Sequence, residues 1–100
     1  MSEEGKLQEE ISKAARAKAI MEDPLMVEAF AMLEQRLIEG LIATNPRDAI
    51  GRENAYRMIH AQRLIRDLLH AIIASGGMAA KELERLAAEA ERKLRIRRVV

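Results

Sequence analysis

The strongest constraint on the fold is the spacing of apolar residues between positions 26 and 41, where they recur at steps of four, three, four and four. These residues are Met26, Phe30, Leu33, Leu37 and Leu41. The spacing matches one face of an α-helix, whereas one face of a strand would need alternate positions. The same steps recur in Ala79, Leu83, Leu86, Ala90 and Leu94. We therefore predict an all-α protein.

Composition agrees with this fold class and limits the size of the core. The 100 residues include 17 alanines and only two aromatic residues, so the core must consist of aliphatic side chains and close helix contacts. Two prolines and five glycines are too few for the turns of a small sandwich or barrel. A chain of this length supports one domain.

The expected architecture is a long antiparallel helical hairpin over residues 24–75, with additional N- and C-terminal helices. Asp23 is a suitable N-cap and Pro24 is preorganised for a first helical turn, so the hairpin begins there. Asn45-Pro46 predicts the tight connection between its two helices.

The second helix of the hairpin is expected over about residues 46–75. Its apolar side is predicted to comprise Met58, Ile65, Leu69 and Ile72, widened by Leu64, Leu68 and Ala71. Ser75-Gly76-Gly77 is typical of a helix end, so we predict that this helix stops there.

The two ends of the chain are expected to add a helix each. Residues 1–22 form an N-terminal helix with a narrow apolar face, which the aliphatic stem of Lys18 must complete, so we expect it to be the most loosely attached element. Residues 78–96 form an amphipathic helix, followed by a basic and aliphatic tail at 97–100. The alternation of arginine and aliphatic residues in the tail is also compatible with a strand.

Surplus apolar residues predict an interface. Residues 24–44 carry a second apolar face, which is explained equally well by two intramolecular neighbours or by contact between subunits. The stripe on 78–96 is under three heptads long and needs packing against the domain or another subunit. The predicted interface residues are Val27, Ala31, Ile38, Ile42, Leu83, Leu86 and Leu94.

The net charge of +1 conceals an acidic half and a basic half. Residues 1–45 have a net charge of −4 and residues 46–100 a net charge of +5. This difference favours pairing between helices and attraction between copies of the chain, and a homo-oligomer is expected.

No residue pattern predicts catalysis, a cofactor or a metal. The chain has no cysteine, and His60 and His70 lie ten residues apart on different faces of a helix. No serine lies in a nucleophile elbow, and Gly76-Gly77 lacks the residues of a phosphate loop. We therefore expect a protein that is not an enzyme and that has no catalytic residues, bound cofactor or metal.

One cationic series lies within residues 46–75. Arg52, Tyr56, Arg63 and Arg66 recur near helical spacing and are candidates for contact with nucleic acid or an acidic partner. The alternative, which we favour, is that this face pairs with Glu28, Glu34 or Glu39 of the preceding helix.

A second cationic series lies near the C-terminus and comprises Arg92, Lys93, Arg95, Arg97 and Arg98. Cations at this position also complement the negative end of a helix. The functional alternatives are electrostatic contact with nucleic acid or docking on an acidic patch of another protein.

The sequence contains no apolar run long enough to span a membrane and no secretory signal. We expect no membrane partner and synthesis in a cytoplasm.

Several segments between Arg16 and Ala80 resemble small helical proteins encoded in tailed-bacteriophage and prophage gene clusters. The segments are 22–30, 43–48, 51–53 and 75–77, and the resemblance covers about two thirds of the chain. The family is largely of unassigned function, so no active-site residues carry over. The resemblance implies a phage protein made in the host cytoplasm and associated with the virion or its assembly.

Three functions are therefore open at the level of sequence. The first is a non-enzymatic virion or assembly protein that self-associates and docks on larger phage structural proteins. The second is a small nucleic-acid-binding or packaging-related protein that uses the two cationic series. The third is a host-directed inhibitor.

Overall fold

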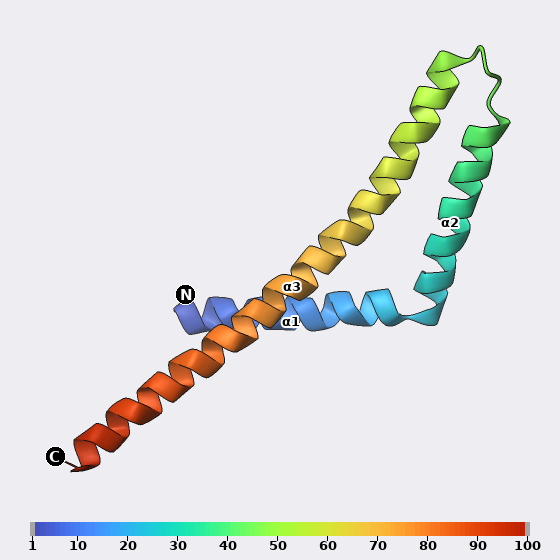
Figure 1. Ribbon diagram of the computed structural model, residues 1–100. Helices are drawn as coiled ribbons and strands as arrows, with labels where there is room; N and C mark the ends of the chain where they lie inside the picture. The colour runs from blue at the N-terminus through green and yellow to red at the C-terminus, as the bar shows by residue number, and fades with distance from the viewer. Residues whose placement is uncertain (1, 100) are drawn as a thin grey trace. The chain divides into compact units, whose positions relative to one another are not determined.

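The computed structural model describes residues 2–99 and contains three α-helices, with no strand among the described residues (Figure 1). They are α1 (Glu3–Glu22), α2 (Pro24–Ala43) and α3 (Ala49–Val99). The predicted all-α class is confirmed. Val100, the last residue of the predicted tail, lies outside the described residues, as does Met1.

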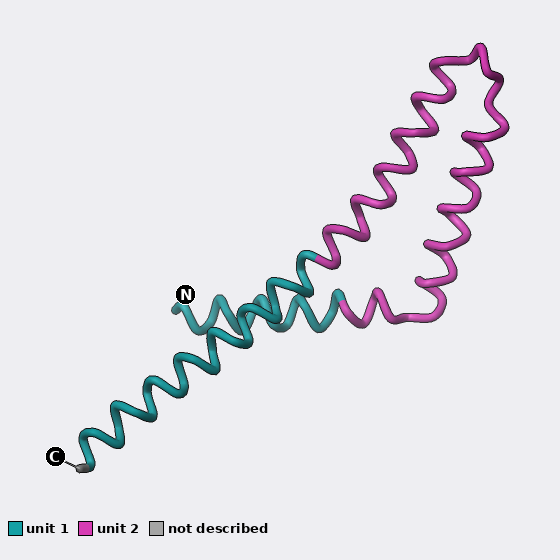
Figure 2. Tube along the Cα trace, viewed as in Figure 1, with its two compact units in different colours: residues 1–17, 71–100 teal, residues 18–70 magenta. Residues whose placement is uncertain are grey.

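The chain divides into two compact units, which are described separately (Figure 2). Residues 18–70 form one unit, called here the α2–α3 unit, and it holds α2 and the first part of α3. Residues up to 17, together with those from 71 onward, form the other, called here the α1–α3 unit.

The predicted start of α2 is confirmed in atomic detail. The Asp23 carboxylate accepts hydrogen bonds from the backbone N–H groups of Leu25 and Met26 at 2.9 and 3.2 Å. Asp23 itself has extended backbone angles, and Pro24 occupies the first helical turn. These bonds satisfy amide donors that have no partner inside the helix.

The connection from α2 to α3 ends at Asp48, two residues after the proline at which α3 was predicted to begin. Asp48 accepts a hydrogen bond from the Gly51 backbone N–H at 2.9 Å, so this carboxylate caps α3. Within the turn, the Arg47 N–H donates to the Asn45 side chain at 2.9 Å. Capping by Asp48 therefore sets the helix start.

In the α2–α3 unit, the side of α3 that packs against the rest of the unit differs from the predicted one. Ile59 and Gln62 are only 7% and 4% exposed, and they belong to a series that steps by four, three, four and three. This series is Ala55, Ile59, Gln62, Arg66 and Leu69, whose other three members are half-buried. On α2 the half-buried positions are Phe30, Glu34, Leu37 and Leu41.

Four residues predicted to form the packed apolar side of α3 are instead exposed. Met58, Leu64, Ile65 and Leu68 are between 52% and 57% exposed. The prediction was wrong because it followed hydrophobicity alone, whereas bonds from Gln62 and its neighbours to α2 set the rotation of α3. Leu69 is half-buried, as predicted.

The predicted helix end at Gly76-Gly77 is wrong, because α3 runs through both glycines as one 51-residue helix. Neither glycine has a positive φ. Gly76 is buried, and a Cβ added to it would lie 2.0 Å from the Cβ of Ala14 and 3.2 Å from the Glu10 carbonyl oxygen. Gly76 therefore allows α1 and α3 to approach closely.

The α1–α3 unit packs through small side chains around this point. Ala17 and Ala79 are 3% and 2% exposed. The expectation that the stem of Lys18 completes the apolar face of α1 is wrong, since Ala17 occupies that place and the Lys18 side chain is 63% exposed. Helices that carry alanine and glycine at a contact can come close enough for their backbones to touch.

The predicted separate helix over 78–96 and the tail from residue 97 are both parts of α3. Residues 97–99 are helical, which excludes the strand alternative for them. Nine ion pairs occur among the described residues, and four of them lie between Glu82 and Arg95, three or four residues apart. These four are the pairs of Arg85 with Glu82 and Glu89, of Lys93 with Glu89 and of Arg95 with Glu91.

Candidate interaction surfaces

The Glu34 carboxylate is the centre of a polar cluster between α2 and α3. It accepts hydrogen bonds from Arg63 Nε at 2.8 Å and from Gln62 Nε2 at 3.2 Å. Arg66 adds an ion pair at 3.6 Å, and its guanidinium lies over the Phe30 ring at 5.1 Å from the centroid. The hydrogen bond from Arg63 lowers the pKa of Glu34, so this carboxyl group is ionised at neutral pH.

Two polar atoms of this cluster are buried without a hydrogen-bond partner among the described residues. They are Gln62 Oε1 and Arg66 Nε, which belong to residues one helical turn apart. A buried donor or acceptor that lacks a partner destabilises a fold by about 1–3 kcal/mol. The cluster therefore positions α2 on α3 at some cost in stability.

Pairing with Glu34, the alternative that the sequence favoured, is confirmed for Arg63 and Arg66. Arg52 is also occupied, because its guanidinium donates to the carbonyl oxygens of Asn45 and Pro46 in the connection. The structure does not bring these three arginines together as one cationic face. Tyr56 is 54% exposed and packs against the His60 ring at a centroid distance of 4.3 Å.

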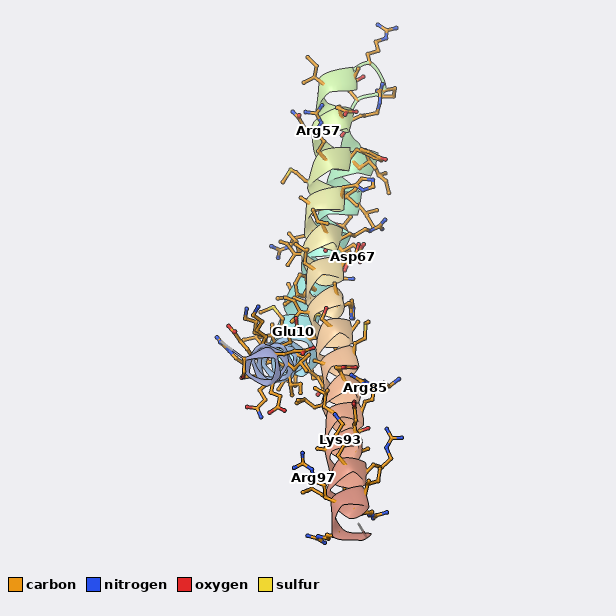
Figure 3. All side chains as sticks on the ribbon, turned by 90° about the vertical axis from the view of Figure 1, so that its left-hand side faces the viewer. Glu10, Arg57, Asp67, Arg85, Lys93 and Arg97 are labelled. Atoms are coloured by element: carbon orange, nitrogen blue, oxygen red, sulfur yellow. The ribbon has the colours of Figure 1, made fainter. Side chains whose placement is uncertain are left out.

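Two of the five cations predicted near the C-terminus of α3 are paired with carboxylates. Lys93 and Arg95 each pair with a glutamate one turn earlier, at 3.4 and 2.8 Å. Among the described residues, no carboxylate lies within 4.0 Å of Arg92, Arg97 or Arg98. Figure 3 shows Arg85, Lys93 and Arg97 spaced along this part of the helix.

The interface residues predicted on α2 are exposed in the α2–α3 unit. Val27, Ile38 and Ile42 are 54%, 37% and 77% exposed, and Ala31 is exposed as well. Ala31 and Ile38 line a shallow hollow together with Glu34, Gln35, Glu39 and Arg66.

The interface residues predicted in the other unit differ among themselves. Leu83 and Leu86 are half-buried, whereas Leu94 is 54% exposed. The stripe on this part of α3 is thus partly covered within the chain near Leu83 and open near Leu94.

A third apolar surface, which the sequence interpretation assigned to the core, lies on α3 itself. We call it the outer stripe, and it comprises Met58, Ala61, Ile65 and Leu68, all exposed. The sequence does not separate the outer stripe from the packed series, because both continue at steps of three and four to Leu94.

The described residues show no arrangement suited to catalysis with a metal. No group of three or more histidine, cysteine or acidic side chains that could hold a metal ion occurs in the described part of the chain. Within residues 2–99, no helix contains an apolar stretch long enough to cross a membrane.

Comparison with protein-family models, with curated proteins and with solved structures gave no match.

Proposed function

We propose that this protein is a non-enzymatic phage virion or assembly protein, which self-associates through helix faces and docks on larger phage proteins. The observation that carries the proposal is the imbalance between covered and uncovered apolar side chains. Three apolar residues are buried among those described, whereas eighteen large apolar ones are exposed. A contiguous exposed apolar surface marks an interaction site, and Val27, Ala31, Ile38 and Ile42 lie together on one side of α2.

In this proposal the α2–α3 unit is an antiparallel hairpin that serves as the association module. The paired positions support that arrangement, because Phe30 contacts Arg66, and Glu34, one turn later on α2, bonds Gln62 and Arg63, earlier on α3. Helix α2 has few polar positions and is apolar on more than one face. A helix of that kind is normally surrounded by other helices.

The proposal also places the protein in the host cytoplasm during synthesis and then in the virion or an assembly intermediate. The phage context comes from the sequence resemblance, and the interaction chemistry comes from the exposed α2 face. Larger phage structural proteins are the proposed partners, since a small helical module with two uncovered faces can contact a copy of itself and a second protein at once.

The direct test is the mass of the full chain in solution, measured by size-exclusion chromatography with light scattering over a range of concentrations. We expect a species larger than a monomer that dissociates on dilution. Pull-down with purified portal, capsid and tail proteins from the same gene cluster then tests docking. A chain that stays monomeric at high concentration and captures none of these proteins contradicts the proposal.

Nucleic-acid binding is a second candidate, supported by Arg92, Arg97 and Arg98, which have no carboxylate within 4.0 Å in the part of the chain that the structure describes. Binding to duplex DNA should weaken steeply as salt rises, because each neutralised phosphate releases counterions. Changing Arg95, Arg97 and Arg98 to glutamine should reduce both the affinity and the salt slope. The matched control is Arg57→Gln, since the Arg57 side chain is 72% exposed elsewhere on α3. Affinity that is unaffected by salt and by the triple change contradicts this candidate.

A further inference from the structure

The outer stripe is an apolar side of α3 that stays exposed while two polar residues are covered on the packed side. Ile65 and Leu68, which are 52% and 56% exposed, lie on a side of α3 that the described part of its unit leaves open. The covered side contains Gln62, with one amide atom unpaired, and Arg66. The chain thus covers a mixed series with α2, in which Gln62 and Arg66 lie among Ala55, Ile59 and Leu69, and leaves a wholly apolar one available to another molecule.

We propose that the outer stripe pairs with the outer stripe of a second copy of the chain, with the two α3 helices antiparallel about a two-fold axis. This inference rests on the proposed function and deepens it, because it assigns self-association to a surface on α3. It leaves the exposed α2 face, formed by Val27, Ala31, Ile38 and Ile42, free for another protein.

The spacing of the outer stripe favours a copy of itself as the partner. Its members follow one another at steps of three, four and three, which read the same in both directions along the helix. In an antiparallel pair Met58 therefore lies opposite Leu68 of the second copy, and Ala61 lies opposite Ile65 of the second copy. Each of these pairs of opposed positions then contains two apolar residues.

The sizes of the side chains favour the antiparallel direction over the parallel one. A parallel pair would place Ala61 against Ala61 and Ile65 against Ile65. The two alanines would then leave a gap between the helices, and the two isoleucines would be crowded. The antiparallel pair combines a small and a large side chain at both central levels. Such alternation fills the space between helices more evenly.

Charge offers no obstacle to the pairing. The outer stripe itself contains no charged residue. Arg63 is two residues from Ala61 and two from Ile65, so it lies on nearly the opposite side of α3, where it bonds Glu34. Arg57, one turn before Ala61 on the flank of the stripe, pairs with Glu53 at 3.1 Å and lies opposite position 69 of the second copy in the antiparallel register. Two copies can therefore approach without placing like charges against each other along the stripe.

The available area is sufficient for a specific but modest dimer. In an antiparallel hairpin, the flank of α2 next to the outer stripe carries Ala29 and Leu33, and Leu33 is 44% exposed. A face about 30 Å long and two helices wide offers about 600 Å² per copy, or about 1,200 Å² in total, which is the lower limit of stable specific interfaces. The outer stripe alone spans about 15 Å of one helix and offers about a quarter of that area, so both helices must take part along their whole paired length.

The first test replaces the central residue of the stripe. Ile65→Lys in the full chain should weaken self-association by about tenfold or more in sedimentation velocity, because a charge is then buried at the centre of the interface. Helix content by circular dichroism should not change, since Ile65 is exposed in the single chain. Ile38→Lys is the matched control on the α2 face, and it should leave the association intact.

The outcomes separate this inference from the proposed function. Association that survives Ile65→Lys and is lost in Ile38→Lys overturns the outer stripe as the dimer surface and leaves self-association standing. A wild-type chain that is monomeric at all concentrations overturns both. Leu68→Gln, a milder change at another level of the stripe, provides the same comparison if Ile65→Lys loses helix content.

The second test uses the absence of cysteine from the chain. Ala61→Cys and Ile65→Cys are prepared as separate full-length variants with different tags, mixed, and oxidised. The antiparallel register predicts a mixed disulfide between position 61 of one copy and position 65 of the other, formed faster than either variant links to itself. Faster linkage of each variant to itself would overturn the proposed register, because it indicates a parallel pair.

Discussion

The two units attach a helix to the same long α3 by different means. In the α2–α3 unit, Glu34 holds α2 in place through Gln62, Arg63 and Arg66. In the α1–α3 unit, contact depends on the lack of a side chain at Gly76, where the backbone of α3 approaches α1. Directional bonds specify one rotation of a helix and leave some polar atoms unpaired, whereas a close contact between small residues depends on volume alone.

The largest expected effect comes from filling the close contact in the α1–α3 unit. Gly76→Ala places a Cβ 2.0 Å from that of Ala14, so one helix must shift. We expect a loss of about 1–3 kcal/mol in the free energy of unfolding, the usual result of overpacking. Urea denaturation followed by circular dichroism measures it.

The adjacent glycine is the control for this experiment. A Cβ at Gly77 meets nothing within 4 Å, so Gly77→Ala should stabilise α3 by up to about 1 kcal/mol through helix propensity. If both alanine variants are equally stabilised, the close contact at Gly76 does not hold α1 in place, and the contrast between the two units fails.

A smaller effect is expected from removing the unpaired amide in the α2–α3 unit. Gln62→Leu deletes the buried Oε1 that lacks a partner, and it also deletes the weaker of the two hydrogen bonds to Glu34. The penalty for an unpaired buried group and the gain from a bond to a charged group are of similar size, so we expect the free energy of unfolding to change by less than about 1 kcal/mol. Thermal unfolding of the full chain tests this, and a melting temperature lowered by many degrees would show that the amide is satisfied in solution.

The smallest expected effect is the pH dependence of the Glu34 cluster. The pKa of the Glu34 carboxyl group in the folded protein lies below the ordinary value of 4.5, so the unfolded chain binds the proton more readily. The contribution of this carboxylate to stability is therefore complete above that ordinary value and is lost as pH falls through the lower folded pKa. Glu34→Gln should be less stable than the wild type at pH 7, and the difference should shrink in acid.

Glu82 provides the comparison for that titration in the other unit. The hydrogen bond from Arg85 lowers the pKa of Glu82 in the same direction, but both residues lie on α3, three positions apart. Glu82→Gln should alter stability in the same pH range without changing how α1 contacts α3. A larger acid dependence in Glu82→Gln than in Glu34→Gln would show that the bonds between helices contribute less than those within one helix.

Local chemistry predicted the parts of the fold that depend on neighbouring residues. The beginning of α2 follows from Asp23 and Pro24, because capping involves side chains and amides only two or three positions apart. The pairing of Glu34 with arginines of the next helix was favoured from charge alone. The outward position of Val27 and Ile42 also agrees with the second apolar face expected on α2.

Predictions that depended on a distant segment failed. Gly76-Gly77 has the composition of a helix end, yet the approach of Ala14 gives Gly76 a role inside a helix. The rotation of α3 was also mispredicted, because the number of apolar residues on a face does not reveal which face another helix will cover. Extending the series from Ala55 to Leu94 does not find the covered side, because its last members are exposed and the outer stripe continues equally far along the helix.

By itself, the sequence determined the fold class, the cap of α2, the position of the connection and the absence of cysteine chemistry, because these depend on periodicity, composition and residues close together in the chain. The tertiary structure alone decided that α3 is continuous, that Gln62 and Arg66 face α2, and that the outer stripe is left uncovered. The physical reason is that the rotation of a helix depends on the bonds and volumes of the helix beside it, which the pattern of either helix alone does not contain.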